Sequence, residues 1–215
     1  MQVNNPLYKN QGIHVISALF TVEEGVTKVL LIKRKNEPFK DMWALVGGAL
    51  YNNETIEEGM QREIEEKTGL KNVKLFPSKN FSKIDRSPLM RMIAISYVGI
   101  VDYKNVDIAK ETLKTSNADF VPIDKVPLLA YDHNEIFDSC LETLREIIFE
   151  TDILKTLFVD GFTLPELQEV CEVILNKEFD RRNFRKWLLL NDMIEDTNKE
   201  VTYKGRKPAK IYVFK

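Results

Sequence analysis

The 215-residue sequence has few cysteines and no long hydrophobic segment. Its two cysteines, Cys140 and Cys171, do not form a C-x-x-C pair, which argues against disulfide or zinc chemistry. No apolar run approaches the roughly 20 residues that a membrane-spanning helix needs. The segment from Met1 to Asn5 also lacks the basic and then apolar profile of a signal peptide. We therefore expect a cytoplasmic protein whose two thiols are reduced and buried.

Internal repeats and low-complexity segments are also absent, and the composition is that of a globular protein. Hydrophobic residues make up 44% of the chain, enough for a sizeable core, and charged residues 30%. The net charge of -2 conceals an asymmetry, because residues 180–215 contain ten Lys and Arg against five Asp and Glu, so the remainder carries -7. A basic terminal segment suits nucleic-acid binding, although many solvated surfaces reach such an excess by chance.

The hydrophobic periodicity indicates two units of different kinds. The first, residues 1–150, combines short strands with amphipathic helices and is of the α/β class. The second, residues 151–215, places three short helices before a β-hairpin, which is the layout of a winged helix-turn-helix domain. We expect strands at 13–20, 28–34, 91–101, 119–123, 193–195 and 209–214, and helices at 55–67, 132–149, 153–158, 163–175 and from 180 onward.

The most informative pattern lies between Gly48 and Leu70. Its anchors are Gly48, Glu54, Arg62, Glu63, Ile64, Glu66, Gly69 and Leu70, with five residues before Glu54 and seven before Arg62. A bare E-x-x-E pair is better explained as the solvated face of a helix, but here every anchor is in register. The pattern resembles the Nudix box, a loop-helix-loop in which glutamates hold a divalent metal against a diphosphate. The resemblance implies a Nudix fold, an α/β/α sandwich around a mixed sheet.

Lys67 departs from the Nudix box, because the family normally has a metal-binding glutamate at this position. On a helix, positions 63, 66 and 67 face one metal cluster, whereas Glu65 lies about 200° around from Lys67 and cannot replace the missing carboxylate. An ammonium group cannot ligate Mg²⁺, and its charge disfavours a nearby cation. It can instead contact phosphate directly.

The box therefore predicts a diphosphate cradle with a damaged hydrolytic centre. The expected catalytic residues are Arg62, Glu63 and Glu66, of which Glu63 and Glu66 are the expected metal ligands. We predict that Mg²⁺ binding is weak or absent.

Further candidate ligand contacts lie upstream and downstream of the box. They are Arg34, Trp43, Gly48 and Arg91, in addition to Lys67. Arg34 and Arg91 lie at strand ends that border the expected cleft, although surface ion pairing explains them equally well. Trp43 is expected either to stack on a ligand base or, more commonly, to fill the core. The segment 43–48 resembles the family's W-A-L-P-G-G entry with valine in place of proline, which predicts a looser loop.

The helix that begins near Asp180 has the division of residues expected of a recognition helix. Phe184, Trp187 and Leu188 are expected to face inward, and basic residues lie on the other side. An ordinary basic surface is the commoner alternative, but a second basic element on the expected wing favours binding to double-stranded DNA. The candidate DNA contacts are Arg181, Arg182, Arg185 and Lys186 on the helix, and Arg206, Lys207 and Lys210 on the wing.

As a whole, the chain resembles the Nudix-related transcriptional regulators, the NrtR-like bacterial family. In the second unit the resemblance rests on segments 162–168, 180–186 and 206–212. It implies a homodimeric repressor of NAD-metabolism genes, released from DNA by ADP-ribose or a related nucleotide, or by sugars in some relatives. It also implies that His133 is a structural or capping residue. The helix at 132–149 is a plausible coupling element between the two units.

Two functional hypotheses follow. The first is a repressor whose degenerate Nudix domain senses ADP-ribose or a related nucleotide or sugar. The alternative is an active Nudix hydrolase of ADP-ribose or another nucleoside diphosphate derivative, with the terminal domain serving dimerisation. Lys67 argues against hydrolysis, whereas the intact Arg62, Glu63 and Glu66 keep it open.

Overall fold

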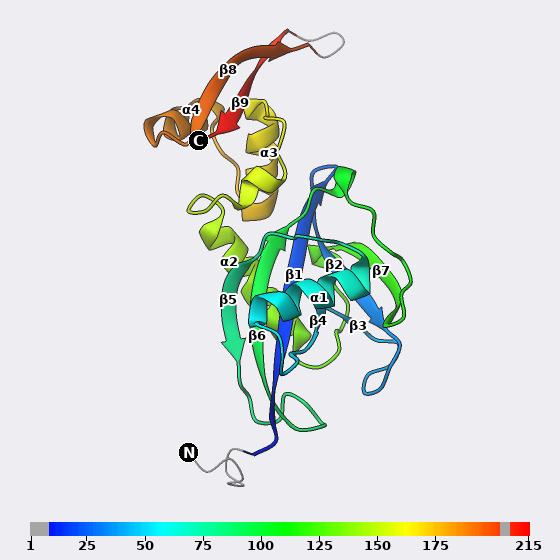
Figure 1. The fold of residues 1–215 in the computed structure, drawn as a ribbon. Helices are drawn as coiled ribbons and strands as arrows, with labels where there is room; N and C mark the ends of the chain where they lie inside the picture. The colour runs from blue at the N-terminus through cyan, green and yellow to red at the C-terminus, as the bar shows by residue number, and fades with distance from the viewer. Residues whose placement is uncertain (1–8, 203–206) are drawn as a thin grey trace.

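The computed structural model describes residues 9–202 and 207–215 and contains two units arranged end to end (Figure 1). The first unit contains β1 (Gln11–Glu23), β2 (Val26–Arg34), β3 (Trp43–Ala44), β4 (Val46–Ala49), α1 (Ile56–Thr68), β5 (Phe76–Phe81), β6 (Arg91–Ile100), η1 (Tyr103–Asn105), β7 (Thr115–Pro122), η2 (Ile123–Lys125) and α2 (His133–Ile147). The second contains η3 (Ile153–Thr156), α3 (Leu164–Leu175), α4 (Arg181–Leu190), β8 (Ile194–Val201) and β9 (Ala209–Phe214). None of the helices in these described ranges is long and apolar enough to cross a membrane.

The seven strands of the first unit form one mixed sheet. Its order is β3-β2-β1-β6-β5, with β4 also paired to β1 and β7 to β2. Strands β1 and β6 are parallel and the other pairs are antiparallel. The strands predicted at 13–20 and 28–34 are confirmed as β1 and β2, and they form a hairpin that closes through Glu24 and Gly25, both with positive φ. Strand β5 is an element that the sequence pattern did not predict.

The sheet is covered by one long helix on each face, as Figure 1 shows for α1 and α2. Alternate residues of β1 divide between the two faces, as the period of a strand requires. Val15 and Leu19 pack with α1 residues such as Ile64, whereas Ile16 and Phe20 belong to the cluster that contains α2. This is the predicted α/β/α sandwich with a mixed sheet.

Helix α1 has a well-defined start and end. Thr55 caps it through a capping box with Glu58, and Gly69 ends it in the left-handed region at φ 77°. Met60 and Ile64, on the apolar side of the helix, are fully buried. The helix therefore has a fixed register, which determines where the charged residues of the box lie.

The second unit is a winged helix-turn-helix domain. Thr163 and Glu166 form a capping box at the start of α3, and Asp180 caps α4 by accepting the N–H of Asn183. Strands β8 and β9 form the hairpin that projects beyond the helices in Figure 1. Strand β8 continues to Val201, well beyond the three residues that the sequence pattern indicated.

The two units share one hydrophobic core on the α2 side of the sheet. The cluster that contains Phe137 and Leu144 of α2 also contains Leu167, Cys171 and Leu188 of the winged helix. The side chain of Arg145 also donates from Nε to the carbonyl of Ile174 at 2.9 Å. Both cysteines are buried and free, as predicted. Helix α2 is thus packed directly against the second unit.

Candidate functional site

The charged residues of the box meet where the turn after β4 approaches α1. Glu63 is only 3% exposed, and its carboxylate lies against Gly48, so that a Cβ at Gly48 would overlap it. This contact explains why glycine is needed at position 48. Residues 48 and 63 were predicted to belong to one site, and the fold brings them together.

Arg62 links the acidic residues of the box. Its guanidinium group lies 2.7 Å from Glu54, 2.5 Å from Glu63 and 3.3 Å from Glu66. It also stacks on Tyr51, with Cζ 3.8 Å from the ring centroid. Hydrogen bonding to Arg62 lowers the pKa of Glu54 to about 2. Arg62 therefore keeps Glu54 charged and holds the three carboxylates together.

Lys67 reaches into the same cluster from the last turn of α1. Its Nζ lies 3.0 Å from Oε2 of Glu63 and also donates to the carbonyl oxygen of Gly47. The residue is 8% exposed, and burial lowers the pKa of its ammonium group, an effect that Glu63 opposes. Burial raises the pKa of Glu63, but the charges of Lys67 and Arg62 outweigh it and leave a net lowering. Both groups are thus held as a buried ion pair.

Lys114, just before β7, completes the cluster and was not predicted from the sequence. Its Nζ forms an ion pair with Glu66 and lies 3.7 Å from Glu63. Glu66 is 48 positions away along the chain, so no local pattern could have indicated the contact. The fold creates it by placing the loop before β7 beside the end of α1.

These residues do not fit a divalent metal site. Within the described part of the chain, no group of three or more His, Cys, Asp or Glu side chains is placed to hold a metal ion. The two expected ligands, Glu63 and Glu66, are engaged by Arg62, Lys67 and Lys114. A hard cation such as Mg²⁺ needs free oxygen ligands, but here the carboxylate oxygens are already paired with basic side chains.

The other candidate ligand contacts are held mainly by backbone carbonyls. Arg34 donates to Pro38 from Nε at 3.0 Å and Nη2 at 2.8 Å, and Arg91 donates to Ser82 and Lys83 at 2.6 and 2.8 Å. Surface ion pairs, the alternative raised by the sequence, are not found for either arginine among the described residues. Their role as ligand contacts stays a prediction.

The entry segment of the box is better ordered than its sequence suggested. Val46 was expected to loosen the loop in place of proline, but it is fully buried in β4 and pairs with Ser17 of β1. Trp43 is partly buried against the core, which favours the core-filling alternative. The valine is tolerated because strand pairing, rather than a restricted φ, fixes this segment.

Two buried contacts tie the start of α2 to other segments, one to the residue before β4 and one to the loop between β5 and β6. His133 accepts the N–H of Leu45 through Nδ1 at 3.1 Å, in agreement with its predicted structural role. Asp132 binds Arg86 with both oxygens at 2.8 Å, and the Arg86 side chain is fully buried. The arginine lies in the loop between β5 and β6 and gave no signal in the sequence.

Stability is expected to fall between pH 7 and pH 5 because the buried His133 and the partly buried His14 are held in the neutral form. Burial, followed by the nearby Arg86, lowers the pKa of His14 to about 4 and that of His133 to about 3. The unfolded chain binds protons at both below about pH 6.5 while the native state does not, so protonation favours unfolding. We expect each histidine to cost about 1–2 kcal/mol at pH 5, measured by urea denaturation.

The variant His133→Asn keeps an acceptor for Leu45 and should lose about half of this pH dependence. Equal unfolding free energies at pH 7 and pH 5 in the wild-type chain would contradict the assignment.

The predicted recognition helix presents its basic residues to solvent. Arg181, Arg182, Arg185 and Lys186 are all exposed, while Phe184 and Leu188 are buried. Trp187 is a correction, since it was predicted to face inward but is 41% exposed, with its ring 4.8 Å from that of Phe149. The tryptophan covers the edge of the core instead of entering it.

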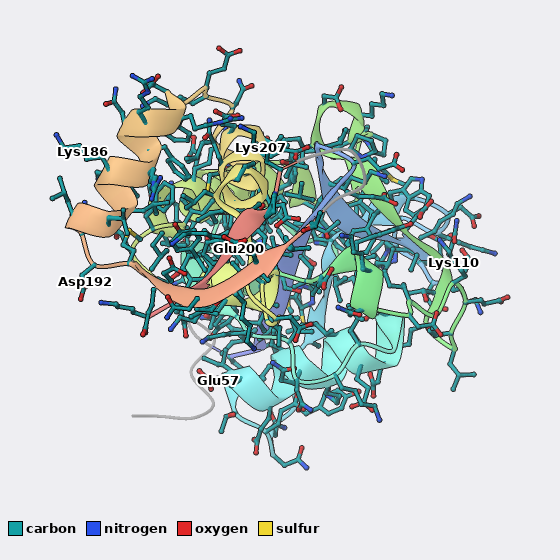
Figure 2. The ribbon with its side chains drawn as sticks, turned by 90° about the horizontal axis from the view of Figure 1, so that it is seen from above. Glu57, Lys110, Lys186, Asp192, Glu200 and Lys207 are labelled. Carbon is teal, nitrogen blue, oxygen red and sulfur yellow. The ribbon has the colours of Figure 1, made fainter. Side chains whose placement is uncertain are left out.

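The predicted wing contacts have different environments. Lys207 is exposed, whereas Lys210 forms an ion pair with Asp196 at 2.6 Å. Arg206 lies outside the described residues. Figure 2 shows Lys186 on the outer side of α4 and Lys207 on the separate hairpin element. Among the predicted DNA contacts that the structure describes, the exposed cations without an ion pair therefore lie chiefly on α4.

Comparisons with known proteins match both units. The family model of the NUDIX domain matches residues 13–140, and that of the NrtR DNA-binding winged helix domain matches residues 154–214. The ADPR responsive transcriptional repressor NtrR of Acinetobacter baylyi is 26% identical over 211 residues, which is 96% of this chain and 83% of that protein. The ADP-ribose pyrophosphatase of Methanocaldococcus jannaschii is 40% identical over 128 residues, or 58% of this chain and 72% of that enzyme.

Solved structures of NrtR from Shewanella oneidensis extend the match to three dimensions. Its complex with a 27mer DNA superposes with a TM-score of 0.78 at 27% identity, covering 94% of this chain and 93% of that one. Its NUDIX domain bound to ADP ribose superposes with a TM-score of 0.60 at 26% identity, covering 65% of this chain and 93% of that one. The order and boundaries of the two matched domains show that the chain belongs to the Nudix-related transcriptional regulators of the NrtR type.

Proposed function

We propose that this protein is a transcriptional repressor that binds operator DNA through its winged helix and releases it when the Nudix domain binds ADP-ribose. The observation that carries the proposal is the exposed basic face of α4, joined to a Nudix domain whose acidic cluster is neutralised by its own cations. The match to a DNA-bound relative over almost the whole chain supports the same conclusion. The similarity to an ADP-ribose pyrophosphatase covers only the Nudix part.

Helix α4 has the chemistry of a major-groove reader. Its exposed arginines can pair with guanine edges or phosphates, while Phe184 and Leu188 anchor it in the core. Among the described residues none of the four cations on this helix forms an ion pair, although Asp196 interacts electrostatically with Arg185, so most of their charge is available for phosphate neutralisation. Lys207 on the hairpin would extend the contact to a second site on the duplex. We propose that two copies bind as a homodimer in the cytoplasm, each occupying one half-site.

For a ligand in the Nudix domain to change DNA binding, its effect must reach α4. Two features of the structure support such a coupling. The core on the α2 face is continuous with that of the winged helix. In addition, a solvent-open groove of about 500 Å³ lies between the β1–β2 turn and α3, lined by Gly25, Tyr103 and Glu169 among others. We propose that this open junction lets the winged helix take more than one position against the sheet. ADP-ribose would shift that equilibrium only if it binds one arrangement more tightly.

The test is the release of DNA by the effector. We expect the full chain to bind a fluorescent operator fragment from a genomic library, and ADP-ribose to lower the anisotropy to that of free DNA. AMP and ribose 5-phosphate, which each carry part of the ligand, serve as controls and should release less. DNA binding that no nucleotide or sugar changes would overturn the sensor. Mg²⁺-dependent consumption of ADP-ribose without DNA binding would favour the hydrolase.

A further inference from the structure

The acidic cluster of the Nudix box is electrically balanced by residues of the chain itself. Three carboxylates and three cations pair with one another in this cluster. They are Glu54, Glu63 and Glu66 on the acidic side and Arg62, Lys67 and Lys114 on the basic side. The net charge of the six groups is therefore zero. A divalent cation would meet no excess negative charge here, and would also have to displace an ammonium group from Glu63.

The position of the Lys67 ammonium group is the more specific observation. It contacts a backbone carbonyl oxygen, that of Gly47, and a carboxylate oxygen of Glu63. Oxygens of these two kinds are the ligands that Mg²⁺ prefers, so Lys67 lies where a hard cation would otherwise be coordinated. An ammonium group has three donors, and these two contacts leave one for a phosphate oxygen.

We propose that Lys67, assisted by Lys114, is a resident cation that replaces a divalent metal, so that a diphosphate ligand is bound without metal. Lys114 supports this role from the rim, because it neutralises Glu66 and lies 3.7 Å from Glu63. The identity of the ligand rests on the proposed function, whereas the replacement of the metal does not. An experiment can therefore contradict the identity of the ligand without contradicting the replacement of the metal, and the reverse.

The test is the variant Lys67→Glu, which removes the ammonium group and places a carboxylate at this position. This variant adds a carboxylate beside Glu63 and changes the charge of the cluster from zero to -2, which a divalent cation can restore to neutrality. We expect the full-length variant to bind Mn²⁺ about tenfold or more tightly than the wild-type chain by calorimetry. Mg²⁺ should raise the melting temperature of the variant and leave that of the wild type unchanged.

Two further variants keep the test interpretable. Lys67→Gln removes the ammonium without adding a ligand, and should gain little Mn²⁺ binding. Lys114→Glu adds a carboxylate at a position whose side chain is 36% exposed, so it should fold even if Lys67→Glu does not, and should also gain Mn²⁺ binding. The proposal is overturned if neither Glu variant binds Mn²⁺ better than Lys67→Gln. It is also overturned if the wild-type chain binds Mn²⁺ equally well and loses it in Glu63→Gln.

The ligand is tested separately by titration of ADP-ribose in EDTA and in Mg²⁺. The wild-type chain should show the same affinity in both, and Lys67→Glu should need Mg²⁺. An ADP-ribose affinity of the wild type that collapses in EDTA would contradict metal-free binding. The metal titrations use neither DNA nor ADP-ribose, so a failure of the proposed function leaves their outcome intact.

Discussion

Replacing Arg86 with methionine is expected to lower the free energy of unfolding by about 3–5 kcal/mol, because it leaves Asp132 buried without its partner. The Arg86 side chain is fully buried and that of Asp132 is 11% exposed, so water cannot compensate for the loss. One nitrogen of Arg86, Nη1, has no partner within the described residues, so the guanidinium group depends on Asp132. Urea denaturation followed by tryptophan fluorescence measures the change.

The same loop offers a matched control. Lys83 forms an ion pair with Glu135 of α2 at 2.6 Å, but the two side chains are 64% and 49% exposed. Lys83→Met should therefore leave the unfolding free energy essentially unchanged. The double variant Arg86→Met with Asp132→Asn should lose less than the sum of the single changes, because neither buried charge remains. Equal losses for Arg86→Met and Lys83→Met would show that burial of the pair has no energetic role.

Replacing both Arg182 and Arg185 with alanine is expected to weaken operator binding by about 100-fold or more, since a good arginine contact contributes about 1–3 kcal/mol. Both side chains are exposed and neither packs in the core, so the fold should persist. Two lost phosphate or base contacts should also lower the dependence of log K on log salt by up to about two. Fluorescence anisotropy at several salt concentrations gives both quantities.

The control removes the same charge from another surface. Lys79 and Lys110 are exposed residues of the Nudix unit, and Figure 2 shows Lys110 on the side of the molecule opposite α4. Lys79→Ala combined with Lys110→Ala should leave operator affinity within about threefold. ADP-ribose affinity should be unchanged in both double variants. Equal losses of DNA binding in the two would indicate a general charge effect and would contradict the assignment of α4.

Local patterns in the sequence predicted much of the fold. The two strands of the first hairpin, the helix start at Thr163 and the register of the box each depend on neighbours in the chain. Such features are readable because residue spacing alone determines which side chains share a face. The prediction of a Nudix unit followed by a winged helix is also confirmed, and it too rests on the spacing of residues along the chain.

Contacts between distant segments could not be predicted. Lys114 meets Glu66 across 48 positions, and Arg86 meets Asp132 across 46, so no spacing rule connects them. The exposure of Trp187 was predicted wrongly because helical spacing gives a face but not the size of the core behind it. The Nudix box indicated that Lys67 replaces one ligand, but only the fold indicated that its ammonium group contacts Glu63 and the carbonyl oxygen of Gly47.

The most direct test of the sensor-repressor is a single titration in which DNA release and the fate of the ligand are followed together. The wild-type chain on labelled operator would receive ADP-ribose in EDTA, with anisotropy recorded and the nucleotide then analysed by chromatography. We predict that DNA is released while ADP-ribose is recovered intact. DNA that stays bound at saturating ADP-ribose, or release that requires conversion of ADP-ribose to AMP, would contradict a repressor that senses its ligand without hydrolysing it.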